Sequence, residues 1–187
     1  NESTGFYHDV IEMPDGSATS LEVFSMQSVV PLFASVSISR ADTEALSTVD
    51  TAVRKVRAAY EIDTGFAPLR PKGGDGTHVL MAVVGHERLE RMLERILDPD
   101  QFLSPHGVRS ISRQHLAEPY VYRVGDQEYS VAYTPAESAN RMFGGNSNWR
   151  GPVWMPMNFM LVQALLAYAS FLGDTFLVPD PADPTGQ

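Results

Sequence analysis

The chain has 187 residues, of which 43% are hydrophobic, enough for one domain with a core of its own. Its formal net charge of −9 would repel a phosphate backbone, so nucleic acid is excluded as an expected partner. Cysteine is absent, which excludes disulfides, thiolate metal sites and cysteine nucleophiles and fits a cytoplasmic protein.

The two ends of the sequence predict a piece of a longer protein. Asn1 stands where a complete chain would begin with Met, and residues 179–184 are rich in Pro and Asp. No signal peptide is visible. The apolar run over residues 159–172 is interrupted by Gln163 and Ser170 and is short for a bilayer, so no membrane contact is expected.

The first half of the chain predicts a hairpin followed by helices. Pro14-Asp15-Gly16-Ser17 is a turn signal, and the hairpin around it should close near residues 21–23. Residues 21–36 carry apolar side chains at helical spacing, although Pro31 should kink that helix or mark its start. Apolar positions three and four apart predict a further helix over residues 46–60.

The second half predicts two helices separated by loops. Residues 78–84 form a short apolar strand or turn, and residues 87–97 form an amphipathic helix. A long loop follows, and then a second hairpin over residues 120–133. Residues 155–172 are apolar on almost every side, which predicts a helix buried all round and capped by Gly173. With no β-α-β alternation, the expected class is all-α with small β-hairpins in the loops.

The densest chemical signal lies just before the last helix. Residues 143–154 combine glycines, asparagines, an arginine and both tryptophans of the chain. Trp faces can stack on sugar rings, and Asn and Arg can hydrogen-bond hydroxyls. Alternatively, the tryptophans fill the core beneath a loop and the arginine binds carbonyls. The candidate substrate-binding residues are Asn148, Trp149, Arg150, Gly151 and Trp154.

Other chemistry finds little support in the sequence. The five histidines show no metal-ligand spacing, so no metal and no cofactor are expected. Ser104, Ser110 and Ser112 lack the pattern of a nucleophile elbow. Glycosidases use a pair of carboxylates, and nothing in the sequence pairs any two of those present.

Residues 144–159 closely resemble the Trp-Arg-Gly-Pro-x-Trp segment of glycoside hydrolase family 63. Residues 5–10, 25–33 and 98–113 also resemble the bacterial members of that family. The resemblance implies an (α/α)6 toroid of helical hairpins and inverting hydrolysis of an α-glycosidic bond by two carboxylates, without a metal or organic cofactor.

The same resemblance implies what this piece would supply. In the family, the acid precedes the Phe-Tyr-x-Asp stretch and the base follows the Trp-Arg-Gly segment at a distance. Residues 1–187 would then be a single interior segment of the catalytic domain that has no catalytic residue of its own, is inactive alone and forms a sugar-binding wall. Its expected partners are an oligosaccharide or small glycoside, the rest of the parent chain, and further copies through helix faces that the cut leaves open.

Two alternatives remain open. One is a non-catalytic carbohydrate-binding or scaffold module with a degenerate toroid. The other is a different six-hairpin enzyme, such as a trehalase-like hydrolase or a phosphorylase, although phosphorolysis needs a basic phosphate pocket that this acidic chain does not show.

Overall fold

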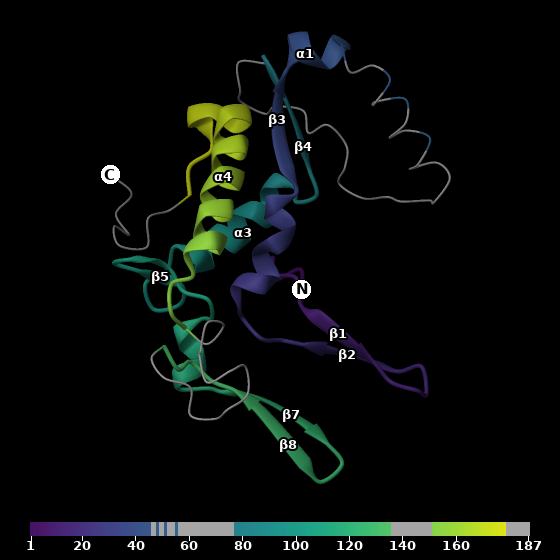
Figure 1. Cartoon of the computed structure of the whole chain (residues 1–187), viewed down its shortest axis with the longest axis vertical. Coiled ribbons are helices and arrows are strands. Elements are labelled where there is room, and N and C mark those ends of the chain that lie inside the picture. Colours follow the sequence, from purple (N-terminus) through teal and green to yellow (C-terminus); the bar gives the residue numbers. More distant parts are fainter. Residues whose placement is uncertain (46–47, 49–50, 52–54, 56–76, 136–150, 179–187) are drawn as a thin grey trace. The chain divides into compact units, whose positions relative to one another are not determined.

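The structure, a computed structural model, describes residues 1–45, 48, 51, 55, 77–135 and 151–178 (Figure 1). The chain forms two compact units. The first consists of Asn1–Val30, Glu87–Phe159 and Val178–Gln187, and the second of Pro31–His86 and Met160–Leu177. Each unit is described by itself.

The first unit begins with the predicted hairpin. Strands β1 (Asp9–Glu12) and β2 (Ala18–Leu21) pair antiparallel, with Asp9 opposite Leu21. In the turn, Gly16 has a φ of 83°, and the Asp15 carboxylate accepts hydrogen bonds from the Ser17 hydroxyl at 2.7 Å and its backbone N–H at 2.9 Å. The hydroxyl bond is the main reason why the pKa of Asp15 lies below its ordinary value. The turn signal is confirmed.

A second hairpin in this unit is also close to the prediction. Strands β7 (Tyr120–Val124) and β8 (Gln127–Val131) pair antiparallel, and Gly125 in the turn has a φ of 58°. The predicted second strand ran to residue 133, whereas the ladder ends at Val131.

Helix α3 (His86–Ile96) confirms the predicted amphipathic helix. The residues of its buried stripe are Leu89, Met92, Leu93 and Ile96. On the other side, the Arg88 guanidinium lies 4.7 Å from the centre of the Tyr7 ring and donates to the Gly5 carbonyl at 3.1 Å. The helix therefore fixes the chain before β1 through both apolar and cation–π contacts.

The region after α3 has more structure than the predicted loop. It contains strands β5 (Leu103–Ser104) and β6 (Gly107–Val108), which pair with each other, and the 3-10 helix η2 (Arg113–Leu116). Ser110, Ile111 and Ser112 between them are buried. Such short pairings leave little periodic signal in a sequence.

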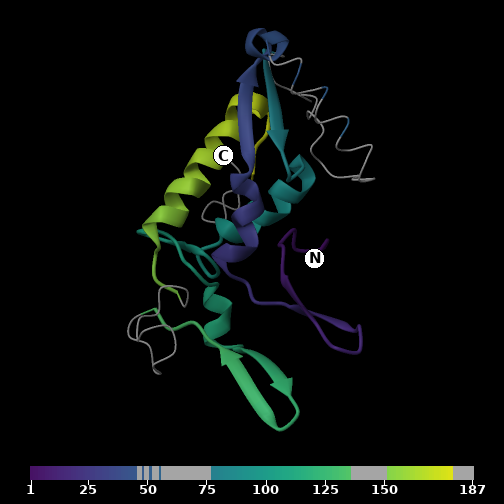
Figure 2. The ribbon, with the colours of Figure 1, turned by 45° about the vertical axis from the view of Figure 1, so that its right-hand side comes forward.

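The helix predicted over residues 21–36 is confirmed in part. Its middle forms the 3-10 helix η1 (Met26–Phe33), which contains Pro31, and its last two residues belong to strand β3 (Ser35–Ser39), which pairs with β4 (His78–Ala82) (Figure 2). The predicted helix is therefore too long at both ends, and it is not an α-helix. Pro31 lacks the N–H that an α-helix would need, and the β-branched Val36 and Ile38 favour a strand. The short helix α1 (Arg40–Ala45) follows, and most of residues 46–60 lie outside the described residues.

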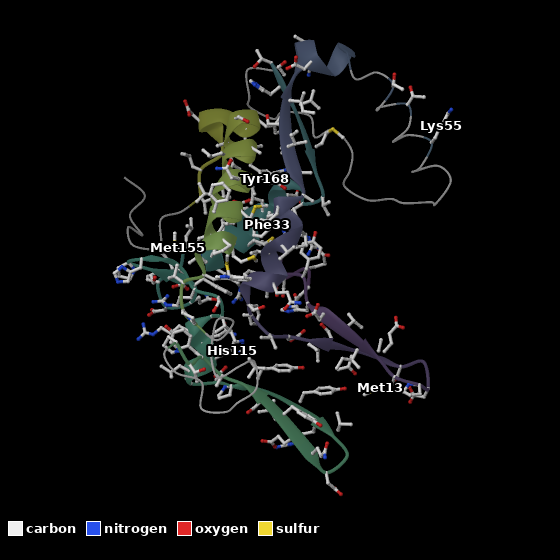
Figure 3. The ribbon with its side chains drawn as sticks, in the orientation of Figure 1. Met13, Phe33, Lys55, His115, Met155 and Tyr168 are labelled. Atoms are coloured by element: carbon white, nitrogen blue, oxygen red, sulfur yellow. The ribbon has the colours of Figure 1, made fainter. Side chains whose placement is uncertain are left out.

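Helix α4 (Met155–Leu172) has the predicted bounds, and Gly173, with a φ of 63°, follows it as the first residue of the 3-10 helix η4 (Gly173–Thr175). On its buried side, the Tyr168 hydroxyl donates to the Val84 carbonyl at 2.6 Å within the second unit (Figure 3). The expectation of burial all round is wrong, because Met155, Phe159 and Leu166 are 65%, 62% and 58% exposed.

Among the described residues, α4 is the one helix that is long and apolar enough to cross a membrane by length and composition. It has 18 residues with a mean hydropathy of 1.4, so length and composition alone do not exclude a membrane span, although the interruptions at Gln163 and Ser170 argued against one. A single helix of this kind is weak evidence for a membrane protein, since a core helix passes the same test.

The expected all-α class, part of an (α/α)6 toroid, is contradicted. The described residues form four two-stranded antiparallel sheets beside their helices. The β3–β4 pair joins segments far apart in the sequence, and local helical spacing gives no sign of such a partner. The helical interpretation relied on the spacing of apolar residues. In the structure, the segment with Pro31 is a 3-10 helix and the β-branched Val36 and Ile38 lie in a strand.

Candidate functional site

Of the five predicted substrate-binding residues, two can be placed. Gly151 and Trp154 belong to the described part, whereas Asn148, Trp149 and Arg150 lie outside it. Gly151 is buried, and its N–H donates to the Ser110 hydroxyl at 2.8 Å. Its φ of 134° suits glycine, and a Cβ added there would lie 2.5 Å from Cε2 of Tyr133. The group that lies against Gly151 is thus the Tyr133 side chain, and whether Gly151 contacts a sugar stays a prediction.

Residues 107–112, the central segment, hold the end of this loop. The Ser110 N–H donates to the Pro152 carbonyl at 3.0 Å, and Arg109 and Val153 form an antiparallel bridge. The Arg109 guanidinium in turn donates to the carbonyls of Pro99 and Leu103. Backbone pairing therefore fixes where the loop ends and where α4 begins.

Asn158, in the first turn of α4, ties the helix to the same segment. Its Oδ1 accepts from the Val108 N–H at 2.7 Å, and its Nδ2 donates to the Val108 carbonyl at 2.9 Å. Nδ2 also donates to the carbonyl of the half-buried Trp154 at 3.0 Å. Sequence reasoning missed this residue. A polar amide in the first turn of an apolar helix was the available signal.

On its other side, the central segment pairs with the chain that leads into η1. The Met26 N–H donates to the Ser110 carbonyl, the Ser112 N–H donates to the Phe24 carbonyl, both at 2.8 Å, and Ser25 bridges Ile111. Ser110 receives the Gly151 N–H, and Ser112 caps η2 by accepting from the Gln114 N–H at 3.3 Å. Both buried hydroxyls therefore accept hydrogen bonds from backbone N–H groups.

His115 closes this arrangement from η2 (Figure 3). Its Nε2 lies 3.0 Å from the Phe24 N–H, and its Nδ1 lies 3.0 Å from the Glu118 carbonyl. Because a carbonyl only accepts, Nδ1 carries the proton and Nε2 accepts. The ring is a buried connector between two backbone segments.

The chain before β1 meets this group through aromatic rings. Phe6 stacks on Phe102 and meets Phe24 edge-on, with both centroid distances at 5.5 Å. His8 lies 5.3 Å from Phe24, and burial is the main cause of a pKa below the ordinary histidine value. The Arg95 guanidinium covers Phe24 at 5.0 Å. All four stretches that carry the sequence resemblance thus contribute to one arrangement within the first unit.

In the part of the chain that the structure describes, no group of three or more His, Asp or Glu side chains could hold a metal ion. The arrangement around the central segment is built from backbone pairs, buried hydroxyls and aromatic rings.

Comparison with known families identifies the chain. Residues 77–176 match the Glycosyl hydrolase family 63 C-terminal domain. The chain belongs to glycoside hydrolase family 63. The family segment contains the central segment, Tyr133, the loop before α4 and almost all the contacts that hold them together.

A relative of this family 63 chain is the uncharacterized protein YMR196W of Saccharomyces cerevisiae. The two are 37% identical over 185 residues, which is 97% of this chain and 17% of the yeast protein. The chain thus spans about a sixth of the length of that relative. No solved structure matches the chain.

Proposed function

We propose that this chain is part of a glycoside hydrolase that cleaves α-glycosidic bonds, and that the loop ending at Trp154 forms one wall of its sugar site. The observation that supports this most directly is the family match over residues 77–176, which includes that loop and the segment that anchors it. The contacts of Gly151, Pro152 and Asn158 hold the end of the loop in place, and a fixed loop end would reduce the entropy lost on sugar binding.

The proposed reaction is hydrolysis with inversion. One carboxylic acid protonates the leaving oxygen, and a carboxylate on the opposite side of the sugar activates water. Both groups belong, in this proposal, to parts of the parent protein outside this chain, which spans 17% of its yeast relative. The chain itself would orient the sugar and exclude water from one side, an effect that raises the fraction of productive encounters.

The loop residues have separate proposed roles. Trp149 would stack on a pyranose face, because its flat apolar ring matches the C–H groups there. Asn148 would hydrogen-bond sugar hydroxyls, and Arg150 would bind either hydroxyls or loop carbonyls. Gly151 would hold its neighbours in place, since its own backbone is fixed to Ser110 and Tyr133. Trp154 would support the wall from the start of α4.

The test is Trp149→Ala in the full-length parent enzyme, assayed with maltose and related α-glucosides. We expect kcat/KM to fall about fivefold or more, the loss that corresponds to one aromatic contact of about 1 kcal/mol. The matched control is Trp154→Ala, which should lower the unfolding temperature more than it changes kcat/KM. Unchanged hydrolysis by Trp149→Ala would mean that the loop is purely structural.

A further inference from the structure

Three tyrosines share one face of the β7–β8 hairpin. In its register, Tyr122 stands opposite Tyr129, and Tyr120 stands opposite Val131. Residues directly opposite in an antiparallel ladder, and residues two apart along a strand, lie on the same face. Val124 and Gln127 complete this surface, which is called the tyrosine face below.

The charges of the strands lie on the other face. Arg123 stands opposite Glu128, and its Nε and Nη2 donate to Oε2 of that carboxylate at 2.9 and 2.8 Å. Within the two strands, the tyrosine face therefore presents rings, hydroxyls, two valines and one amide but no charged side chain; outside the hairpin, the Glu22 carboxylate acts on Tyr120. Such a surface matches a neutral ligand that combines apolar C–H faces with hydroxyl groups.

The outer part of the tyrosine face is open. Tyr129 is 49% exposed, and its hydroxyl donates to Gln127 Oε1 at 2.7 Å, so its oxygen can still accept. Tyr120, nearer the base, is more enclosed. Burial is the main cause that raises the pKa of its hydroxyl, and Tyr122 and Glu22 add to the effect.

The strand β8 ends two residues before Tyr133, which contacts the end of the candidate loop at Gly151. Two residues beyond β8, the Tyr133 N–H donates to the His115 carbonyl at 3.1 Å, and the Tyr133 ring packs against Gly151. The span from Tyr129 to Tyr133 is at most about 13 Å. A ligand bound beside the Gly151 loop therefore needs only a few sugar units to reach Tyr129.

We propose that the tyrosine face is a stacking platform for a neutral oligosaccharide that extends outward from the loop at Gly151. This rests on the proposed function, because it assumes that the loop binds sugar. Tyr120 and Tyr122 follow each other at about 6.7 Å along the strand, and Tyr129 stands opposite Tyr122, so one oligosaccharide can contact more than one of these rings. The rings would stack on sugar C–H faces, while tyrosine hydroxyls and the Gln127 amide bind sugar hydroxyls.

The experiment is calorimetric titration of the full chain with maltoheptaose. We expect Tyr122→Ala and Tyr129→Ala each to weaken binding about fivefold, as the loss of one ring contact predicts. Tyr129→Phe should stay within about twofold of the wild type, because the ring remains. Val121→Ala is the matched control from the opposite face and should not change affinity. A thermal melt of each variant verifies folding.

The same titrations separate this proposal from the loop assignment. Each tyrosine variant is also measured together with Trp149→Ala. If Trp149→Ala weakens binding while both tyrosine variants bind like the wild type, the platform is wrong and the loop assignment stands. If only the tyrosine variants weaken binding, the loop assignment is wrong. No binding of maltoheptaose to the wild-type chain overturns the platform.

Discussion

Gly151 and Gly16 both adopt a positive φ, but their surroundings differ. A Cβ at Gly151 would lie 2.5 and 2.7 Å from two ring carbons of Tyr133, whereas a Cβ at Gly16 would meet nothing within 4 Å. Alanine at either position adds backbone strain, and only alanine at Gly151 adds a collision. Comparing alanine variants at the two positions therefore separates the free-energy cost of backbone strain from that of a steric collision.

We expect Gly151→Ala to lower the free energy of unfolding by about 3 kcal/mol, through strain and overpacking together. Gly16→Ala should cost about 1 kcal/mol, since it adds strain alone. Urea unfolding of both variants measures the difference. In a Tyr133→Ala background the cost of Gly151→Ala should fall toward that of Gly16→Ala, and equal costs in all backgrounds would show that the ring does not constrain the glycine.

At the level of single residues, the sequence indicated Gly151 as a candidate substrate-binding residue. The structure shows what surrounds it, which is the Ser110 hydroxyl and the Tyr133 ring. The identity of the approaching group could not be predicted, because Tyr133 and Ser110 reach Gly151 through tertiary folding. A local pattern describes what a residue permits, and its partner comes from elsewhere in the chain.

At the scale of elements, α4 shows which features of a helix can be predicted from the pattern of apolar residues. Its bounds followed from the apolar run and the glycine after it. Because nearly every position is apolar, the sequence does not tell which side is buried. In the structure Tyr168 and Leu161 are buried, while Phe159, Val162 and Leu166 are exposed. These exposed residues, with Met155 one turn earlier, form a stripe at steps of four, three and four residues.

We expect the chain to self-associate through this stripe, as exposed apolar patches commonly do. Replacing Phe159 and Leu166 together by Glu should shift the chain toward the monomer in sedimentation velocity. Ser130→Glu, an added charge at an exposed position of β8, is the control and should not shift it. A wild-type chain that stays monomeric at every concentration, or a double variant that associates equally, would contradict the expectation. In the parent protein we propose that other chain segments cover the stripe.

The β3–β4 pair marks the limit of element prediction. Ser35–Ser39 alternates serine with β-branched residues, a pattern that fits a strand on inspection. Two features hide this strand in the sequence. The apolar spacing before it also fits a helix, and its partner strand, His78–Ala82, is distant in the sequence. Neighbouring turn signals, by contrast, identified both hairpins, since their strands are adjacent along the chain.

For the whole molecule, the family was predictable and the fold class was not. Short motifs such as Trp-Arg-Gly-Pro allow the family to be recognised even when the topology of the fold is not known. The all-α expectation combined that resemblance with helical spacing, and the described residues place four small sheets among the helices. Of the site, Gly151 and Trp154 were predicted as candidate residues, and the anchoring of Gly151 by the central segment and of α4 by Asn158 was not predicted.

We expect the chain by itself to hydrolyse neither α-glucosides nor α-mannosides. The resemblance implies that the acid and the base of the family belong to other segments, and this chain spans 17% of its yeast relative. Purified chain and full-length parent should be incubated with the same substrate panel. Only the parent should give turnover, and activity that copurifies with the chain would contradict this.

Asn158 and Val108 are joined by two hydrogen bonds that run in opposite directions. The side-chain amide sets an acceptor against an N–H and a donor against a carbonyl. Turning the amide over would place oxygen against oxygen and N–H against N–H, so the contact has a direction as well as a strength. An aspartate of the same shape would direct negative charge at two carbonyls, those of Val108 and Trp154. The junction between the loop and α4 therefore needs a side chain at residue 158 that both donates and accepts a hydrogen bond, as an amide does.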